Sequence, residues 1–265
     1  MPSQGTSTFE LFALRFQFTA QLAVHFPQGQ TANLFRGQFG KILYRRDPAA
    51  YARFFAPVGE AGPSGLHDPP RPFVLRVRHL DGAVLDRFHV GLNLFETNRP
   101  EIGAIRDTMA ELGRESLRAD LVDLEGQEIL HLPLAAARPV ERVRVQFLSP
   151  TELKNSDRPE FGPLFSRIRD RISTLSALYG SGPLEIDFQA MGERAAAIRM
   201  THCDVLHVDA ERISRNKRHP LGGFIGVAEY EGDLTGFIPY LEIAVYTGVG
   251  RQTVWGKGEI SVEVF

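Results

Sequence analysis

The residues best suited to hold a ligand lie in a glycine-rich segment near the end of the chain, TGVGRQTVWGKGEI (247–260). Its four glycines follow a G-x-G-x5-G-x-G pattern, and Arg251 and Lys257 stand among them. Glycine lets the backbone approach a ligand closely and adopt positive φ, and cations beside backbone N–H groups suit a phosphate. The pattern is neither a Rossmann fingerprint nor a Walker loop, because no βαβ unit follows it and Lys257 precedes a glycine. The alternative interpretation is a pair of tight turns before a final strand.

Two basic stretches stand out on a chain whose formal net charge is only −2. Residues 31–53 carry five cations and one acid, and residues 212–219 (RISRNKRH) carry four cations and no acid. Because net charge says nothing about how charge is distributed, a phosphate-rich partner is compatible with both stretches. Ordinary solvated surface is the other interpretation.

Residues 201–207 (THCDVLH) contain two histidines, the single cysteine and an aspartate, all of which can bind metal. Alternation along a strand puts His202 and Asp204 on one face and Cys203 and His207 on the other. The four side chains therefore do not converge on one ion, and we expect no metal site. No other cofactor is expected.

Composition bounds the class of protein. The chain has 265 residues, 43% hydrophobic and 23% charged, which suits one large or two small folded domains and excludes a wholly disordered chain. One cysteine excludes an intrachain disulfide and fits a reducing compartment. No window approaches the roughly 18 consecutive apolar residues of a membrane span, and the first residues lack a signal peptide's features. We therefore expect a cytoplasmic protein with no membrane contact.

The hydrophobic patterns predict the order β-α-β-β-α-β twice. The first half has strands at 9–22, 72–78, 85–95 and 117–132, the last with a hairpin-like return, and helices at 32–46 and 100–112. The second half has strands at 142–148, 196–213, 220–232 and 258–265, and helices at 160–179 and 233–244.

Two such units predict an α+β fold of two tandem ferredoxin-like domains. Each domain would have an antiparallel sheet with helices on one face. The linker 132–141, with two prolines, places the boundary between an N-terminal domain of residues 1–138 and a C-terminal domain of residues 139–265.

The segment HPLGGFIGVAEYEGDLTGFIPYLEIAVYTGVGRQTVWGKGEISV (219–262) resembles the C-terminal half of CRISPR-associated endoribonucleases of the RAMP superfamily, the sixth Cas family. FRGQFGKILYRR (35–46) resembles the Leu-Arg-Gly helix of that family, and VRVQFLSPTELK (143–154) resembles the opening of its second domain. Many relatives carry a small cysteine cluster between the positions of Arg46 and Tyr51. This chain has none there, so no metal site is carried over.

The resemblance implies metal-independent cleavage of precursor CRISPR RNA. The 2′-OH of the RNA attacks the adjacent phosphate and leaves a 2′,3′-cyclic phosphate and a 5′-OH. Such a step needs a base for the 2′-OH, an acid for the leaving 5′ oxygen and cations for the developing negative charge. Histidine fits the acid and base roles best, because its ordinary pKa is about 6.5.

In this family the catalytic residue usually lies in or just after the first helix, but residues 34–55 contain no histidine. His25 precedes that helix and His67 follows it, so these two are the candidate acid or base. The second set of catalytic candidates is Lys41, Tyr44 and Arg45, a phenol between two cations. Their other interpretation is the solvent face of an amphipathic helix.

RNA binding is assigned to the cations of the second basic stretch, to the glycine-rich segment and to the Arg-Gly helix. Strand alternation predicts that Arg215 and Lys217 share one face, with Arg212 and Arg218 on the other. Trp255 and Phe224 are candidate base-stacking surfaces. The full set of RNA-binding candidates is Arg36, Arg212, Arg215, Lys217, Arg218, His219, Gly248, Gly250, Arg251, Gly256, Lys257 and Gly258.

The expected partners are CRISPR repeat RNA, precursor CRISPR RNA and other Cas proteins of an effector complex, with the chain as a monomer or homodimer. A second interpretation is a RAMP-type subunit that holds guide RNA without cutting it, which the missing helix histidine favours. A third, a metabolic enzyme or ligand-binding regulator with a ferredoxin-like fold, would need a compact polar pocket, for which the sequence carries no motif.

Overall fold

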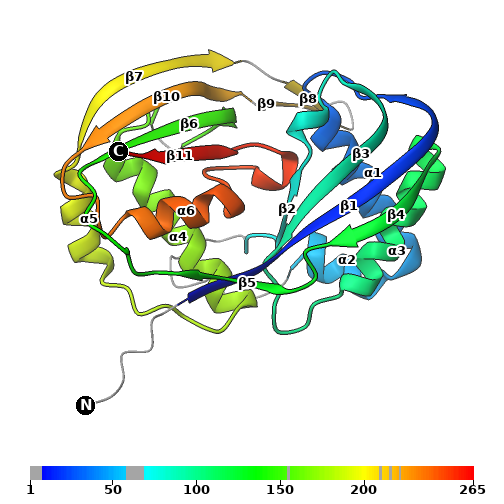
Figure 1. Ribbon diagram of the computed structural model, residues 1–265, viewed down its shortest axis with the longest axis horizontal. Coiled ribbons are helices and arrows are strands. Elements are labelled where there is room, and N and C mark those ends of the chain that lie inside the picture. Colours follow the sequence, from blue (N-terminus) through cyan, green and yellow to red (C-terminus); the bar gives the residue numbers. More distant parts are fainter. Residues whose placement is uncertain (1–7, 58–68, 154–155, 209–210, 215–216, 221) are drawn as a thin grey trace.

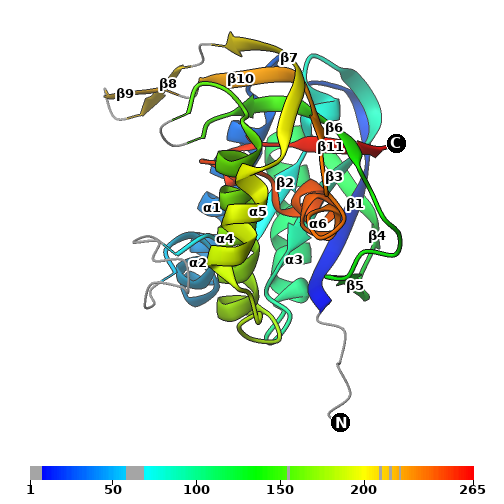
Figure 2. The same ribbon diagram turned by 90° about the vertical axis from the view of Figure 1, so that its left-hand side faces the viewer.

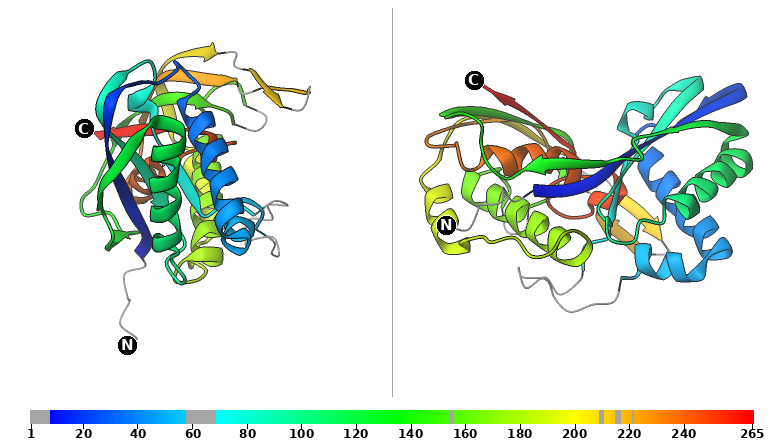
Figure 3. Two further views of the ribbon diagram at one scale, coloured as in Figure 1. Left: turned by 90° about the vertical axis from the view of Figure 1, so that its right-hand side faces the viewer. Right: turned by 60° about the horizontal axis from the view of Figure 1, so that its bottom comes forward.

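The computed structural model describes residues 8–57, 69–153, 156–208, 211–214, 217–220 and 222–265. Two antiparallel sheets lie side by side, one from residues 8–133 and one from residues 142–264 (Figure 1). Each sheet is covered by helices on one of its faces, as the two views in Figure 3 show. The domain boundary predicted between residues 138 and 139 falls between the two sheets.

The first sheet has the strand order β2-β3-β1-β4, which is the order of a ferredoxin-like βαββαβ unit. A fifth strand, β5, also pairs with β1. The elements are β1 (Thr8–His25), α1 (Thr31–Arg46), α2 (Pro48–Phe55), β2 (Phe73–Arg76), η1 (Arg78–Leu80), β3 (Val84–Leu94), α3 (Ile102–Leu112), the π-helical turn η2 (Gly113–Leu117), β4 (Ala119–Glu125) and β5 (Ile129–Pro133).

The second sheet repeats this topology with the order β11-β6-β10-β7. A two-stranded ribbon, β8-β9, is inserted between β7 and β10. The elements are β6 (Arg142–Thr151), α4 (Phe161–Tyr179), α5 (Phe188–Ala196), β7 (Arg199–Val208), β8 (Glu211–Ser214), β9 (Lys217–Pro220), β10 (Gly223–Glu231), α6 (Ile238–Thr247), η3 (Thr253–Trp255) and β11 (Ile260–Val264). The predicted fold class, α+β with two ferredoxin-like units, is confirmed.

Two of the predicted strands differ from the structure. The return after residue 125 is no hairpin, because β4 and β5 both pair with β1: Ala20 faces Ala119, and Thr8 faces Pro133. β1 is 18 residues long, and its two ends therefore accept different partners along the same edge. The strand predicted over 196–213 is interrupted, with β7 ending at Val208 and β8 beginning at Glu211.

Two short helices, α2 and α5, were not predicted, because each has only eight or nine residues, too few for the pattern to stand out. Each helix is preceded by an aspartate whose carboxylate accepts a hydrogen bond from a backbone N–H of the first turn. Asp47 accepts from Ala50 N at 2.9 Å, and Asp187 accepts from Ala190 N at 2.9 Å. Such caps satisfy donors that a helix start leaves without partners. α2 therefore begins directly after α1 ends, which folds the chain back against α1.

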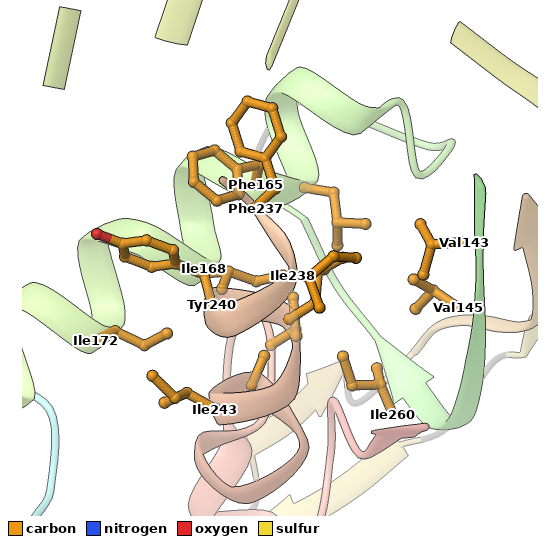
Figure 4. Packing of buried hydrophobic residues seen from close by; sticks show 14 of the residues in the cluster. Val143, Val145, Phe165, Ile168, Ile172, Phe237, Ile238, Tyr240, Ile243 and Ile260 are labelled. Atoms are coloured by element: carbon orange, nitrogen blue, oxygen red, sulfur yellow. The ribbon is translucent and has the colours of Figure 1, made fainter. Parts of the chain in front are cut away.

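The core of the second half extends across the seam into the first half. In the second half, α4 and α6 pack on β6 and β11 through residues such as Phe165, Ile168, Val145 and Ile260 (Figure 4). The same cluster takes in buried residues of the first half, Phe9, Leu11, Val74 and Phe95. Each Å² of apolar surface that is buried stabilises the fold by about 25 cal/mol. This shared cluster therefore holds the two halves in a fixed relative position.

The ribbon β8-β9 extends away from the body of the second half (Figure 2). Its register pairs Arg212 with His219 and Ser214 with Lys217. Directly opposed residues share a face, so positions 212, 217 and 219 lie on one face and position 218 on the other. The prediction that Arg212 and Arg218 share a face was wrong, because Arg218 pairs with Ile213, the neighbour of Arg212 on the opposite face of β8. Arg215 lies outside the described residues.

Within the described ranges, no helix is long and apolar enough to cross a lipid bilayer.

Candidate functional site

A groove runs along the exposed side of α1, where α2 and the segment leading into β2 face it. Lys41 and Tyr44 come from α1, three residues and so one turn apart, and the Tyr44 side chain is 60% exposed. The buried positions of α1 are Phe35, Phe39, Ile42 and Leu43, so helical periodicity leaves Lys41 and Tyr44 facing solvent. The groove is lined by Arg36, Gly37, Gly40, Lys41, Tyr44, Tyr51, Phe55 and Arg71.

Three aromatic rings of the groove contact one another in series. Tyr44 meets Tyr51 edge-on with ring centroids 5.1 Å apart, and Tyr51 stacks on Phe55 at 5.0 Å. Arg71 Nε donates to the carbonyl oxygen of Phe55 at 3.0 Å, which ties the segment before β2 to the end of α2. The groove thus combines two phenols with three guanidinium or ammonium groups, a set that can bind a phosphate and supply a proton.

Arg36 joins this groove to the glycine-rich segment of the other half. Its guanidinium carbon lies 3.6 Å from the centroid of the Trp255 ring and 5.3 Å from that of Phe55. Trp255 belongs to η3, in the middle of the glycine-rich segment. A cation held over two aromatic rings contributes about 0.5–2 kcal/mol and fixes the guanidinium orientation. Arg36 therefore braces the wall of the groove.

The four glycines of the segment all have positive φ, between 67° and 78°. A side chain at Gly258 would meet the carbonyl oxygen of Val249 at 1.9 Å, and one at Gly250 would meet that of Glu152 at 2.3 Å. The segment is thus packed backbone to backbone against itself and against the residues after β6. The glycines are required by these close approaches, which favours the interpretation as tight turns over a phosphate-binding loop for the glycine positions themselves.

Lys257 is buried, with only 4% of its surface exposed. Its Nζ donates to the carbonyl oxygen of Gly222 at 2.8 Å and to Gln252 Oε1 at 3.1 Å. Burial lowers the pKa of this ammonium to about 8. Because the side chain is buried, it is not placed to make the predicted contact with RNA. Instead, Lys257 connects the glycine-rich segment to the start of β10.

The end of α6, which leads into the segment, is capped from two directions. Arg76 of β2 donates to the carbonyl oxygens of Val245 at 2.7 Å and Tyr246 at 2.9 Å, and Asn93 of β3 donates to Tyr246 at 2.9 Å. Arg171 of α4 donates to Thr247 at 2.9 Å. Burial lowers the pKa of both arginines to about 10. These cations satisfy carbonyls that a helix end leaves without partners and oppose the negative end of its dipole.

Comparisons with known proteins bear on the family and the fold. Residues 145–260 match the sequence model of the family described as CRISPR-associated endoribonuclease Cas6. That match contains β10, α6 and the whole glycine-rich segment. The match is confined to the second half of the chain. A comparison with curated protein sequences found no match.

Solved Cas6 structures extend the similarity to the first half. A product complex of Thermus thermophilus Cas6 has 16% identity and a TM-score of 0.62, and the alignment covers 96% of this chain and 100% of that one. A second Cas6 product complex has 15% identity, a TM-score of 0.62 and coverage of 96% and 99%. A structure described as a RAMP protein binding different RNA substrates has 9% identity, a TM-score of 0.52 and coverage of 95% and 99%. At such identities the similarity is one of fold.

The remaining predicted catalytic residues lie apart from the groove. His25 ends β1 and lines a different pocket, on the other flank of α1. Arg45 forms ion pairs with Glu111 of α3 and Glu115 of η2. His67 lies outside the described residues. The structure therefore brings together Lys41 and Tyr44 with Arg36, and leaves His25 and Arg45 elsewhere.

Among the RNA-binding candidates, Arg251 is exposed and pairs with Glu152 Oε1 at 3.0 Å. Phe224 is buried in the core, so it offers no stacking surface for a base. Positions 212 and 217–219 lie on the projecting ribbon.

Sequence reasoning missed Tyr51 and Arg71. Tyr51 stands seven residues after Tyr44, a helical spacing that the proline at position 48 obscured. Arg71 lies in a Pro-rich stretch with no periodicity, and only the folded chain places it at the groove.

Proposed function

We propose that this chain is a Cas6-type endoribonuclease, which binds CRISPR repeat RNA and cleaves precursor CRISPR RNA without a metal ion. The observation that supports this most directly is the groove on α1, where Lys41, Arg36 and Arg71 meet the phenols of Tyr44 and Tyr51. Lys41 and Tyr44 are the proposed catalytic residues.

The proposed step is a transesterification within the RNA. The 2′ oxygen forms a bond to the adjacent phosphorus while the bond from phosphorus to the 5′ oxygen breaks. The 2′-OH proton leaves to a base, and the 5′ oxygen gains a proton, so the products are a 2′,3′-cyclic phosphate and a 5′-OH. A correctly held strand supplies much of the acceleration, which is why a site without histidine can serve.

Lys41 and Tyr44 suit the two ends of that step. An ammonium at Lys41 neutralises charge that develops on the phosphate oxygens, and the Tyr44 phenol can hold or protonate the leaving oxygen. Arg71, fixed by the Phe55 carbonyl, adds a second cation on the opposite wall.

Relatives support the substrate and the partners. Structures similar in fold are described as Cas6 product complexes and as a Cas6 substrate mimic complex. Two others are described as Cas6-RT-Cas1–Cas2 complexes, in full and in part. We extend both to this chain as proposals: repeat RNA as substrate, and other Cas proteins as partners.

The test is cleavage of a repeat RNA in EDTA. We expect a single cut with a 2′,3′-cyclic phosphate on the upstream product, and no cut when the nucleotide upstream of the scissile phosphate is 2′-deoxy. Cleavage that disappears in EDTA and returns with Mg²⁺ would contradict the metal-free mechanism.

A second candidate function is a guide-RNA-binding subunit that does not cut. It is favoured by one observation, that no histidine lines the groove in the described part of the chain. Tight repeat binding with no cleavage of any repeat tested would establish this function instead.

A further inference from the structure

A second pocket lies on the other flank of α1, enclosed by the end of β1 and by the π-helical turn η2. Its volume is about 230 Å³. Pockets that hold drug-sized ligands measure about 300–1,000 Å³, so this one suits a single flat ring system. It is lined by Val24, His25, Phe26, Pro27, Thr31, Leu34, Phe35, Gln38, Leu112, Ser116 and Leu117.

The polar groups in this pocket are available to a ligand. The His25 ring, the Gln38 amide and the Ser116 hydroxyl make no hydrogen bond to another residue in the part of the chain that the structure describes. Together they offer donors and acceptors at the edges of a mostly apolar space. Apolar walls with a few polar groups are what a heteroaromatic ring with polar edges requires.

The turn that forms one wall has unusual backbone geometry. Gly113–Leu117 is π-helical, a rare form that is frequent at functional sites, and it places Ser116 and Leu117 at the pocket. Arg118, which ends it, has φ of 51°, an uncommon value for a residue other than glycine. Gly113 is held tightly, because a side chain there would meet Ala119 O at 2.6 Å. The surrounding sheet therefore imposes this conformation.

The pocket adjoins the proposed catalytic groove. Gln38 lines the pocket and Lys41, three residues later, lines the groove. Side chains three apart on a helix are about 5–6 Å from each other at Cβ. An RNA that contacts Lys41 in the groove therefore lies next to Gln38 at the edge of the pocket.

We infer that this pocket binds one unpaired nucleobase of the repeat RNA, flanking the phosphate that is cleaved. This inference rests on the proposed function, because it takes the α1 groove as the place where RNA is cut. Here His25 contacts a base and is not the acid or base of the reaction. Single-stranded RNA is commonly read in this way, with a base splayed out into a pocket of apolar contacts and edge hydrogen bonds.

The experiment combines changes in the RNA with changes in the protein. Each nucleotide within three positions of the cut is replaced in turn by an abasic unit, and the affinity of each RNA is measured by fluorescence anisotropy alongside its cleavage rate. The proteins are wild type, Leu34→Arg, which fills the pocket mouth, and Gln38→Ala. The matched control is Leu22→Arg, because Leu22 is also an exposed leucine but does not line the pocket.

We expect one abasic position to weaken wild-type binding about tenfold, the usual scale for losing one base contact. In Leu34→Arg and Gln38→Ala the same abasic unit should lower the affinity less than twofold, because in these variants the base no longer binds in the pocket. Leu22→Arg should behave as wild type. Thermal unfolding of each variant checks that it folds.

If abasic effects are equal in wild type and in both pocket variants, the pocket holds no base, and this inference fails while RNA cleavage stands. If wild type binds without cutting, the affinities alone decide the inference and the cleavage mechanism fails separately. If wild type does not bind any repeat RNA, both fail.

Discussion

Lys41 and Tyr44 stand one turn apart on α1 and carry the proposed chemistry. We expect Lys41→Ala to reduce the cleavage rate about a hundredfold, because positioned proton donors and charge stabilisers contribute on that scale. Tyr44→Phe should reduce the rate as well while keeping the ring contact with Tyr51. Single-turnover cleavage with saturating protein measures this, and RNA affinity should change less than the rate.

The control for these variants is Arg106→Ala, an exposed cation on α3 that pairs with its neighbour Asp107. It should cleave as wild type does. Normal single-turnover rates in both Lys41→Ala and Tyr44→Phe would remove the groove from the mechanism.

Lys257 gives a stability prediction with a definite sign. Its pKa in the folded chain is about 8, below the ordinary value of 10.5 for a lysine. Between those values the unfolded chain binds more protons than the folded chain, so the free energy of unfolding rises with pH across that window. The rise is at most about 1.4 kcal/mol per pH unit.

The measurement is urea unfolding of wild type and Lys257→Met at pH 7.5, 8.5 and 9.5. Groups other than Lys257 titrate in both proteins, so the difference isolates its contribution. Wild type should gain stability relative to Lys257→Met as the pH increases. A difference that is constant with pH would mean that the ammonium keeps its ordinary pKa in the fold.

At the scale of elements, the end of α6 connects the fold to the site. Arg76→Met removes the donors to Val245 and Tyr246, while Tyr246 keeps Asn93. Because a buried carbonyl left without a partner costs about 1–3 kcal/mol, we expect a loss of that size in the free energy of unfolding. Arg78→Met is the control: this nearby arginine is exposed and pairs with Glu259, so its loss should cost less than about 1 kcal/mol. Equal losses in urea unfolding would show that the cap adds nothing.

The order of the elements could be predicted because each long helix and strand carries its own periodicity. α4 is an example, with Phe161, Leu164, Phe165, Ile168 and Ile172 on one buried stripe. The candidate site could be predicted only in part. The placement of Lys41 and Tyr44 on one exposed helix face follows from helix geometry. Arg71 reaches the groove only because the fold brings the segment before β2 next to α1 and α2. Burial of Lys257 likewise depends on packing against Gly222, which no local pattern reports.

At the scale of the whole molecule, the projecting ribbon and the α1 groove belong to opposite halves of the fold, and one RNA must reach both if both contact it. Arg212 and Lys217 lie on one face of the ribbon by register. We predict that reversing both charges, Arg212→Glu with Lys217→Glu, weakens repeat RNA binding at least tenfold at moderate salt. Each lost phosphate contact should also lower the slope of log affinity against log salt by about 0.7 for a single strand.

The matched control changes the same net charge elsewhere. Arg99 and Arg138 are exposed and lie on connecting segments, so Arg99→Glu with Arg138→Glu alters the charge of the whole molecule equally. If binding depends on local phosphate contacts, only the ribbon variant loses affinity and salt slope, and its cleavage rate at saturating protein stays near that of wild type. Equal weakening in both double variants would mean that net charge steers the RNA, and that the ribbon makes no specific contact.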